Sequence, residues 1–475
     1  MLLTKENIKQ IKPASDLLLP QQQHLSLPER VIEFGTGVLL RGLPNQMIDG
    51  ANKRGVFNGR VVVVKSTDKG GTEAFALQQG LYTVCVRGIS EGLPVDQKIV
   101  NASISRVLTA STEWEQILEC ASNLDINIVI SNVTEVGMKL VKEDRITDTP
   151  PCSFPGKLLA YLHKRYQVFN GSVDSGMVIL PTELIPDNGK VLKNILLELA
   201  ALNQCTPGFM EWLAEANDFC STLVDRIVPG ALPKQEQLQV AQQLGYEDQL
   251  MIMAEPYSLW AIETSRTRTR EILTFATVDP GVVIAKDINH YREIKIRLLN
   301  APHTFCCALA LVQGFDTVKQ AMDNVEFRSF ITELMLHEII PVLVNTEISQ
   351  EEAVSFAGKV LDRFSNPYIA HEWLSISAQY TSKIALRCVP ILLNYYNKYK
   401  TYPRCITKGF AAYLLFMKSE QNSEGRYEGH IHQKSYLIND DKAARLHAHW
   451  TAGELDTVVQ QVLADHELWG ADLSL

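Results

Sequence analysis

The chain has few of the features that mark secreted, disulfide-bonded or membrane proteins. Its nine cysteines form an odd count without a CxxC pair, and most lie in apolar runs such as 305–308, which is typical of reduced, buried thiols. The first residues carry charges where a signal peptide needs its apolar stretch, and no run approaches the roughly 18 apolar residues of a membrane span. We therefore expect a cytoplasmic protein with no membrane partner.

The chain also lacks an excess of positive charge. It has 45 Lys and Arg residues against 54 Asp and Glu, a formal net charge of −9 at pH 7, which argues against a general affinity for nucleic acid. Its composition, 46% hydrophobic and 21% charged, is ordinary for a globular protein, and 475 residues suffice for two or three domains with large cores. We expect a small-molecule partner, no nucleic acid, and a monomer or weak homo-oligomer.

Strand-like and helix-like segments alternate in the first half of the chain. Helical segments at 113–121, 157–166 and 191–202 lie among short apolar runs at 31–34, 60–64, 126–130 and 176–180. Continuous apolar runs are typical of parallel strands covered on both faces. The pattern predicts an α/β fold with a Rossmann-type, doubly wound sheet, preceded by a polar, irregular arm over residues 1–30.

The pattern changes after a turn signal at 279–281. Apolar residues then recur at helical spacing over 288–325, 327–345, 350–364, 371–399 and 405–418, with few strand candidates. We expect residues 1–277 to form the NAD-binding Rossmann-type domain with its N-terminal arm. Residues 278–475 are expected to form a mainly α-helical substrate and catalytic domain.

A glycine-rich turn follows the first predicted strand. Gly35, Thr36 and Gly37 lead into a predicted helix that begins with Val38 and Leu39. Small residues allow the backbone to approach a pyrophosphate, whose charge a helix N-terminus favours. The full GxGxxG motif is absent because position 40 is Leu, so a tight turn without a ligand is the alternative.

Two later segments supply further candidates for cofactor contacts. Asp68 follows the second strand, where an acidic residue would hold the ribose hydroxyls of NAD. Lys65 and Ser66 would equally suit the 2′-phosphate of NADP. At the carboxyl end of the run 126–130, where open sheets bind ligands, the candidates are Ser131, Asn132, Thr134 and Glu135. A helix cap is the alternative there. The sequence favours NAD, with no metal required.

Lys295, Asn300 and His303 lie close together in a predicted helix. At about 100° per residue, Asn300 lies about 140° and His303 about 80° from Lys295, so all three can face one cleft, although Pro302 should distort the turn. Carbonyl reduction needs a proton donor, which a desolvated lysine can supply, and a donor to the developing alkoxide, which an asparagine amide can supply. A solvated lysine and a core histidine are the alternative.

These motifs occur in a familiar order, followed by the segment Arg-Phe-Ser-Asn-Pro at 363–367. From about residue 31 to about residue 469 the chain resembles the polyol-specific long-chain dehydrogenase family, or mannitol dehydrogenase family, and the KxxxxNxxH motif is the most specific part. The resemblance implies that Lys295 is the general acid/base and that His303 positions the substrate. It implies that Asn300 shares an oxyanion site with Asn188 of the first domain, and it links Asp225 to the proton route.

The chain departs from the mannitol enzymes of this family after residue 366. Ala370 takes the place of an arginine and is followed by His371, whereas Lys383 and Arg387 lie one turn apart further on and can pair with a carboxylate. In these positions the chain resembles the branch of the family that acts on keto-sugar acids.

The branch implies NADH-dependent reduction of D-tagaturonate to D-altronate in hexuronate catabolism, with His371, Lys383 and Arg387 as substrate contacts. Fructuronate reduction and a mannitol 2-dehydrogenase-type activity are the alternatives, and Lys383 and Arg387 as solvated helix charges would favour the latter. Glu183 and Glu255 lie near predicted cleft loops without an assigned role.

Overall fold

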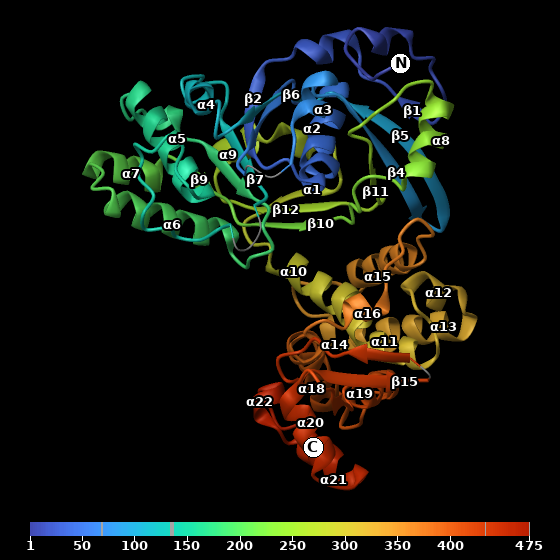
Figure 1. The fold of residues 1–475 in the computed structure, drawn as a ribbon. Helices are drawn as coiled ribbons and strands as arrows, with labels where there is room; N and C mark the ends of the chain where they lie inside the picture. Colours follow the sequence, from blue (N-terminus) through green and yellow to red (C-terminus); the bar gives the residue numbers. More distant parts are fainter. Residues whose placement is uncertain (68–69, 134–136, 433, 475) are drawn as a thin grey trace. The chain divides into compact units, whose positions relative to one another are not determined.

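The computed structural model describes residues 1–67, 70–133, 137–432 and 434–474. The chain divides into two compact units (Figure 1). Unit 1 comprises Met1–Arg87 and Val95–Ile288, and unit 2 comprises Gly88–Pro94 and Asn289–Leu475. Within the described ranges, no helix has both the length and the apolar character needed to cross a membrane.

Unit 1 is built around a six-stranded parallel sheet with the order β6-β3-β2-β7-β8-β9. Its strands are β2 (Glu29–Phe34), β3 (Arg60–Lys65), β6 (Ile104–Thr109), β7 (Ile128–Ser131), β8 (Val178–Pro181) and β9 (Asp218–Phe219). The order reverses between β2 and β7, which is the topological switch point of a Rossmann fold. The predicted Rossmann-type sheet is confirmed.

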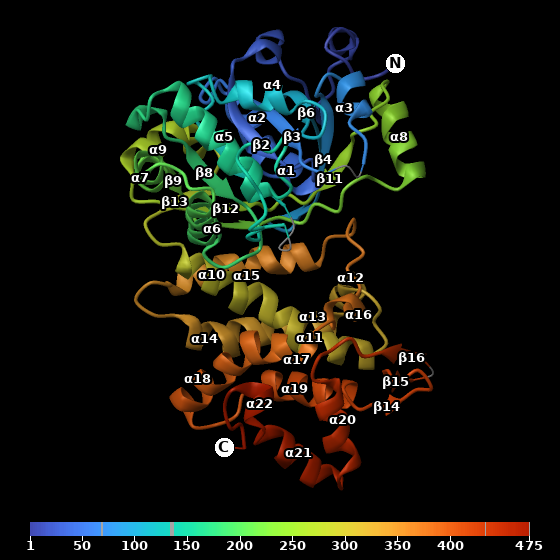
Figure 2. The ribbon, with the colours of Figure 1, turned by 60° about the vertical axis from the view of Figure 1, so that its left-hand side comes forward.

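Both faces of this sheet are covered, which explains its continuous apolar strands. Alternate residues of a strand point to opposite faces: Val62 and Val64 belong to one core, whereas Val61 and Val63 belong to the other. The first core packs against α4 (Trp114–Cys120), α5 (Phe154–Val168), α6 (Asn188–Leu202) and α7 (Pro207–Glu215), which gather on one side of the sheet in Figure 2. The second core packs against α1 (Val38–Gly42) and α2 (Pro44–Lys53).

Two smaller sheets complete unit 1. The first has the order β1-β5-β4-β11 and contains β1 (Leu17–Leu18), β4 (Tyr82–Ser90), β5 (Leu93–Asn101) and β11 (Ile252–Ala254). The second contains β10 (Thr222–Asp225), β12 (Leu259–Glu263) and β13 (Val282–Ala285). The helices α3 (Glu73–Leu77), α8 (Lys234–Leu244) and α9 (Thr267–Ile272) also belong to this unit.

Two features of unit 1 differ from the sequence prediction. Residues 1–30 are not a polar arm, because Leu3, Ile8 and Leu17 are buried in a small core of their own. The strand β13 pairs in parallel with β12, so the sheet extends past residue 277 and the chain divides between Ile288 and Asn289.

Unit 2 is mainly helical, as predicted. Its longest helices are α11 (Ala301–Val312), α13 (Val325–Glu333), α15 (Gln350–Phe364), α18 (Val389–Tyr399), α19 (Arg404–Phe416), α20 (Ala443–Thr451) and α21 (Leu455–Leu463). Shorter ones are α10 (Asn289–Lys295), α12 (Val318–Asp323), α14 (Ile340–Leu343), α16 (Trp373–Ile376), α17 (Tyr380–Lys383) and α22 (His466–Trp469). A small antiparallel sheet that the sequence did not predict consists of β14 (Glu420–Gln421), β15 (Tyr427–Ile431) and β16 (Lys434–Leu437).

Three π-helical turns interrupt stretches that the sequence predicted as continuous helix. They are η5 (Ile296–Asn300), η6 (Leu334–Ile339) and η7 (Ile384–Cys388), and each is followed by an α-helix with a proline near its start: Pro302, Pro341 and Pro390. Proline lacks the backbone N–H and clashes with the carbonyl four residues earlier, so a regular α-helical turn is unfavourable there. The wider turn accommodates this local conflict, and π-turns are frequent at functional sites.

Candidate active site

The glycine turn lies at the switch point of the parallel sheet. Gly35 has φ +135°, and its N–H donates to the Val64 carbonyl at 3.0 Å. A Cβ at this position would lie 2.9 Å from Leu40 Cδ1 and 3.1 Å from the Asn132 carbonyl oxygen, so only glycine fits. Gly37 is exposed, and nothing lies closer to the corresponding position than Asn132 Oδ1 at 3.9 Å. The turn therefore offers open backbone beside the carboxyl ends of two neighbouring strands.

The other residues of this turn are partly accessible. Thr36, Val38 and Leu39 are half-buried. The helix that follows, α1, has only five residues. The turn is therefore a candidate cofactor site because of its position at the switch point, and not because of a helix dipole.

The ends of β7 and β8 are joined beside this turn. The Asn132 side-chain amide donates to the carbonyl and hydroxyl oxygens of Thr182, and both the N–H and the hydroxyl of Thr182 donate to the Ser131 carbonyl. Ser131 is buried and Asn132 is half-buried. The predicted cofactor residues Asp68, Thr134 and Glu135 lie outside the described residues.

Asn188, the first residue of α6, is fully buried and held by backbone groups. Its Nδ2 donates to the carbonyls of Pro181 and Glu183 at 3.0 Å and lies 3.2 Å from that of Thr222, whereas Oδ1 accepts the N–H of Thr222 at 2.8 Å. These acceptors account for both amide protons. An oxyanion contact from Asn188, as the family resemblance implies, would require it to give up one of these bonds.

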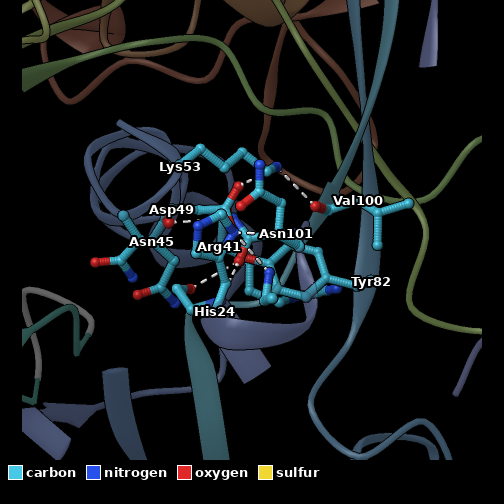
Figure 3. A network of polar contacts seen from close by, with 12 residues as sticks. His24, Arg41, Asn45, Asp49, Lys53, Tyr82, Val100 and Asn101 are labelled. Atoms are coloured by element: carbon cyan, nitrogen blue, oxygen red, sulfur yellow. Dashed lines mark hydrogen bonds and ion pairs between the residues drawn. The ribbon is translucent and has the colours of Figure 1, made fainter. Parts of the chain in front are cut away.

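A buried polar network supports the turn from α2 (Figure 3). Glu33, two residues before Gly35, accepts a hydrogen bond from Asn45 Nδ2 at 3.1 Å, and burial raises the pKa of its carboxyl to about 8. Asp49 accepts from Lys53 and from the Ala102 N–H, and Asn101 Nδ2 donates to the Asn45 carbonyl. These contacts fix α2 against the end of β5.

In unit 2, the π-turn η5 relates Lys295 to Asn300. The Ala301 N–H donates to the Ile296 carbonyl, five residues earlier. In a turn closed by such bonds, residues five apart lie one turn apart on the same side of the helix. Lys295 immediately precedes the turn and Asn300 ends it, and both are half-buried. The separation of 140° expected for a regular helix is therefore replaced by near alignment.

His303 lies among aromatic rings and cations of unit 2. Its ring stacks on Phe364 with centroids 3.9 Å apart and meets the His371 ring edge-on at 5.2 Å. Its Nε2 is buried, without a hydrogen-bond partner among the residues that the structure describes. Burial, and then the nearby charges of His371, Arg363 and Arg387, hold the pKa of His303 well below its usual value. Burial and then Lys383 also lower the pKa of His371.

Lys383 and Arg387 belong to the same cluster. Lys383 Nζ donates to the Ile376 carbonyl at 2.8 Å, and Arg387 Nη1 lies 3.3 Å from the Thr304 hydroxyl, which donates to the Asn300 carbonyl at 2.8 Å. Both cations are half-buried, and burial is the main cause that lowers the pKa of each. In the described part of the chain, neither forms an ion pair with a carboxylate. This cluster therefore has positive charge to offer an anion.

Hydrogen bonds join the two π-turns η5 and η7, which contain Asn300 and Arg387, respectively. Arg297 of η5 donates to the carbonyls of Leu386 and Arg387 in η7, at 2.8 and 2.9 Å. Unit 2 thus brings together Asn300, His303, His371, Lys383 and Arg387. Sequence reasoning missed Thr304, the link between Arg387 and Asn300, because a lone threonine on an apolar helix gives no signal.

Within the described ranges, no three His, Cys, Asp or Glu side chains are placed to hold a metal ion.

The fold and these two sets of residues define a two-domain dehydrogenase. The mannitol dehydrogenase Rossmann domain family matches residues 29–273, and the mannitol dehydrogenase C-terminal domain family matches residues 287–475. The chain therefore belongs to the mannitol dehydrogenase family, and it is an oxidoreductase that acts on CH–OH groups. The resemblance inferred from the motifs is confirmed.

Individual relatives support the same assignment. The altronate oxidoreductase of Halalkalibacterium halodurans is 38% identical over 458 residues, covering 94% of this chain and 88% of that protein. The altronate oxidoreductase of Bacillus subtilis is 36% identical over 447 residues, covering 94% and 89%.

Solved structures show the same fold. The Pseudomonas fluorescens mannitol 2-dehydrogenase complex with NAD and D-mannitol has a TM-score of 0.70 at 22% identity and covers 100% of this chain and 94% of that one. A substrate-free D-sorbitol dehydrogenase has a TM-score of 0.77 at 20% identity and covers 97% and 93%.

Proposed function

We propose that the protein catalyses the NADH-dependent, reversible reduction of the keto-sugar acid D-tagaturonate to D-altronate in the cytoplasm. The observation that carries this proposal is the cluster of cations in unit 2, where Arg387 lies near His303 and Lys383 lies near His371, and neither cation forms an ion pair with a carboxylate among the described residues. A bound uronate would supply that partner, whereas a neutral polyol would not. The altronate oxidoreductases that resemble the chain over 94% of its length favour the same substrate.

Unit 1 is assigned the cofactor. The open backbone at Gly35–Thr36–Gly37, with Val38 and Leu39 after it, suits a dinucleotide pyrophosphate at the switch point, and Ser131 and Asn132 border it. Asp68, Thr134 and Glu135 stay predicted contacts, with Asp68 as the reason to favour NAD over NADP. When bound, NADH supplies the hydride for the carbonyl carbon.

Unit 2 is assigned proton transfer and substrate binding. Lys295 gives a proton to the oxygen of the carbonyl as it becomes an alcohol, and takes it back in the reverse direction. Asn300, on the same side of the π-turn, donates its amide to the same oxygen while negative charge develops. His303 is neutral at pH 7, so its unpartnered Nε2 can accept a hydrogen bond from a substrate hydroxyl. Arg387 forms the stronger contact with the carboxylate, with Lys383 as a second charge and His371 beside them.

Asn188 is assigned a supporting part in unit 1. Its amide protons are used by backbone carbonyls, so the main oxyanion contact falls to Asn300. Fructuronate, which carries the same carboxylate, is the second candidate substrate, because the cation pair alone does not distinguish the two epimers.

The reverse reaction tests the proposal. Purified protein is incubated with NAD⁺ and altronate, mannonate or mannitol, and formation of NADH is followed by absorbance, with NADP⁺ in a parallel series. We expect the highest kcat/KM with altronate and NAD⁺. A clear preference for mannitol would overturn the acid-sugar assignment, and a preference for NADP⁺ would overturn the cofactor assignment.

A further inference from the structure

Glu183 lies two residues after the end of β8, at the same end of the parallel sheet as the glycine turn. Its side chain is only 3% exposed. One carboxylate oxygen, Oε1, accepts the Val133 N–H at 2.8 Å, and the other, Oε2, accepts the Ser131 hydroxyl at 3.2 Å. Ser131 is the last residue of β7, and Val133 lies in the segment that follows it. The carboxylate therefore holds a neighbouring segment of the sheet edge rather than its own loop.

The segment that Glu183 holds also borders the glycine turn. The Asn132 N–H donates to the Phe34 carbonyl at 3.2 Å, at the end of β2. The Asn132 carbonyl and side-chain oxygens lie next to Gly35 and Gly37. Asn132 is thus held by the end of β2 through its N–H and by Thr182 through its side-chain amide. Its two neighbours in sequence, Ser131 and Val133, are held by Glu183.

A carboxylate is a costly choice for a purely structural bond at this depth. Burial raises the pKa of Glu183, and the hydrogen bonds from Val133 and Ser131 oppose that shift. A neutral acceptor would make comparable bonds without the cost of a buried charge. The charge strengthens its bonds to the two donors, which favours a role in which the exact position of residues 131–133 matters.

We propose that Glu183 is a positioning residue of the cofactor site: its carboxylate fixes residues 131–133 so that Asn132 forms the wall of the NAD-binding turn. This inference rests on the proposed function, because it takes the switch point as the NAD site. Glu183 does not touch the cofactor itself and acts through Ser131 and Val133.

The test compares NADH affinity, measured by fluorescence titration, with the steady-state KM values of wild type, Glu183→Ala and Glu183→Gln. We expect Glu183→Ala to weaken NADH binding about ten- to a hundredfold, since two bonds to a charged acceptor are lost. The KM for the keto acid should stay within about twofold because those contacts lie in unit 2. Glu183→Gln keeps an oxygen for the Val133 N–H and should recover most of the affinity.

Asp218→Ala serves as the matched control. Asp218 accepts hydrogen bonds from the hydroxyls of Thr264 and Thr269, at 2.6 and 2.5 Å. It lies beside Val178, the first residue of β8, and therefore at the end of the sheet opposite to the glycine turn. Its loss should lower the melting temperature and leave NADH affinity unchanged. If Glu183→Ala does not fold, Glu183→Asp replaces it, because the shorter side chain withdraws the carboxylate from Val133.

These measurements distinguish a failure of the positioning role of Glu183 from a failure of the proposed function. A folded Glu183→Ala or Glu183→Asp protein with wild-type NADH affinity, or a Glu183→Gln protein as weak as Glu183→Ala, overturns the positioning role and leaves the proposed function intact. A wild-type protein that binds neither NADH nor NADPH overturns the proposed function, and the role of Glu183 with it.

Discussion

Replacing Arg387 by methionine should separate acidic from neutral substrates. Arg387 is half-buried, its side chain contacts the Thr304 hydroxyl, and burial lowers its pKa. Removing a charged partner from a bound carboxylate costs roughly 2–5 kcal/mol. Because Lys383 remains nearby, we expect the lower part of that range, about 2–3 kcal/mol, or a loss of about 30- to 150-fold in kcat/KM for tagaturonate.

The assay measures kcat and KM of wild type and Arg387→Met for tagaturonate and for neutral fructose at saturating NADH. The loss should appear mainly in the KM for the acid, whereas any weak activity on fructose is spared or improved. Lys398→Met is the control, since Lys398 is exposed on α18 and donates to the Pro341 carbonyl. Equal losses on acid and neutral sugar would show that Arg387 is structural, and the mannitol-type activity would then be favoured.

Three further changes have defined outcomes. Lys295→Ala should fold and bind NADH but lose about a hundred- to ten-thousandfold in turnover, and near wild-type turnover at neutral pH would refute its acid/base role. Asn300→Ala should lower kcat, because the activation free energy rises by about 3–4 kcal/mol when one oxyanion donor is lost. A change confined to NADH affinity would instead place Asn300 in the cofactor site. Hydrogen bonds from Arg445 and His449 outweigh burial and hold the pKa of Asp465 to about 2, below its ordinary 3.8. Its stabilisation is therefore present above about pH 4 and lost as the pH falls toward 2. Asp465→Asn should lower the melting temperature at pH 7 and flatten its acid dependence, and an unchanged acid profile would contradict the assignment.

Much of unit 1 was predictable because its signals are local. The β-branched run at 60–64 becomes β3, and the turn at Gly35 requires a glycine, so composition and spacing sufficed for both. The burial of Leu3 and Ile8 was not predictable, because they belong to the same core cluster as Val100 and Tyr246, far along the chain. A polar segment with scattered apolar residues shows no period until its partners are in place.

For the candidate site, the sequence indicated residue types but not their geometry. The spacing from Lys295 to His303 predicted a candidate catalytic segment, but the angle expected for a regular helix does not apply to Asn300, because a π-turn precedes Pro302. Pro302 indicated that the helix would be distorted, but the sequence did not predict that the distortion is a π-turn. Similarly, Asn188 was expected to face the substrate, and only the positions of three carbonyls reveal that its amide is engaged.

Competition between two uronates tests the central claim most directly. Equal concentrations of tagaturonate and fructuronate are reduced together with limiting NADH, and the altronate and mannonate formed are quantified, so their ratio gives the ratio of the two kcat/KM values. The proposal predicts that altronate is the main product and that adding excess fructose leaves the ratio and the total unchanged. Mannonate as the main product would assign the enzyme to fructuronate, and reduction of fructose in preference to both acids would contradict the carboxylate-binding role of Lys383 and Arg387.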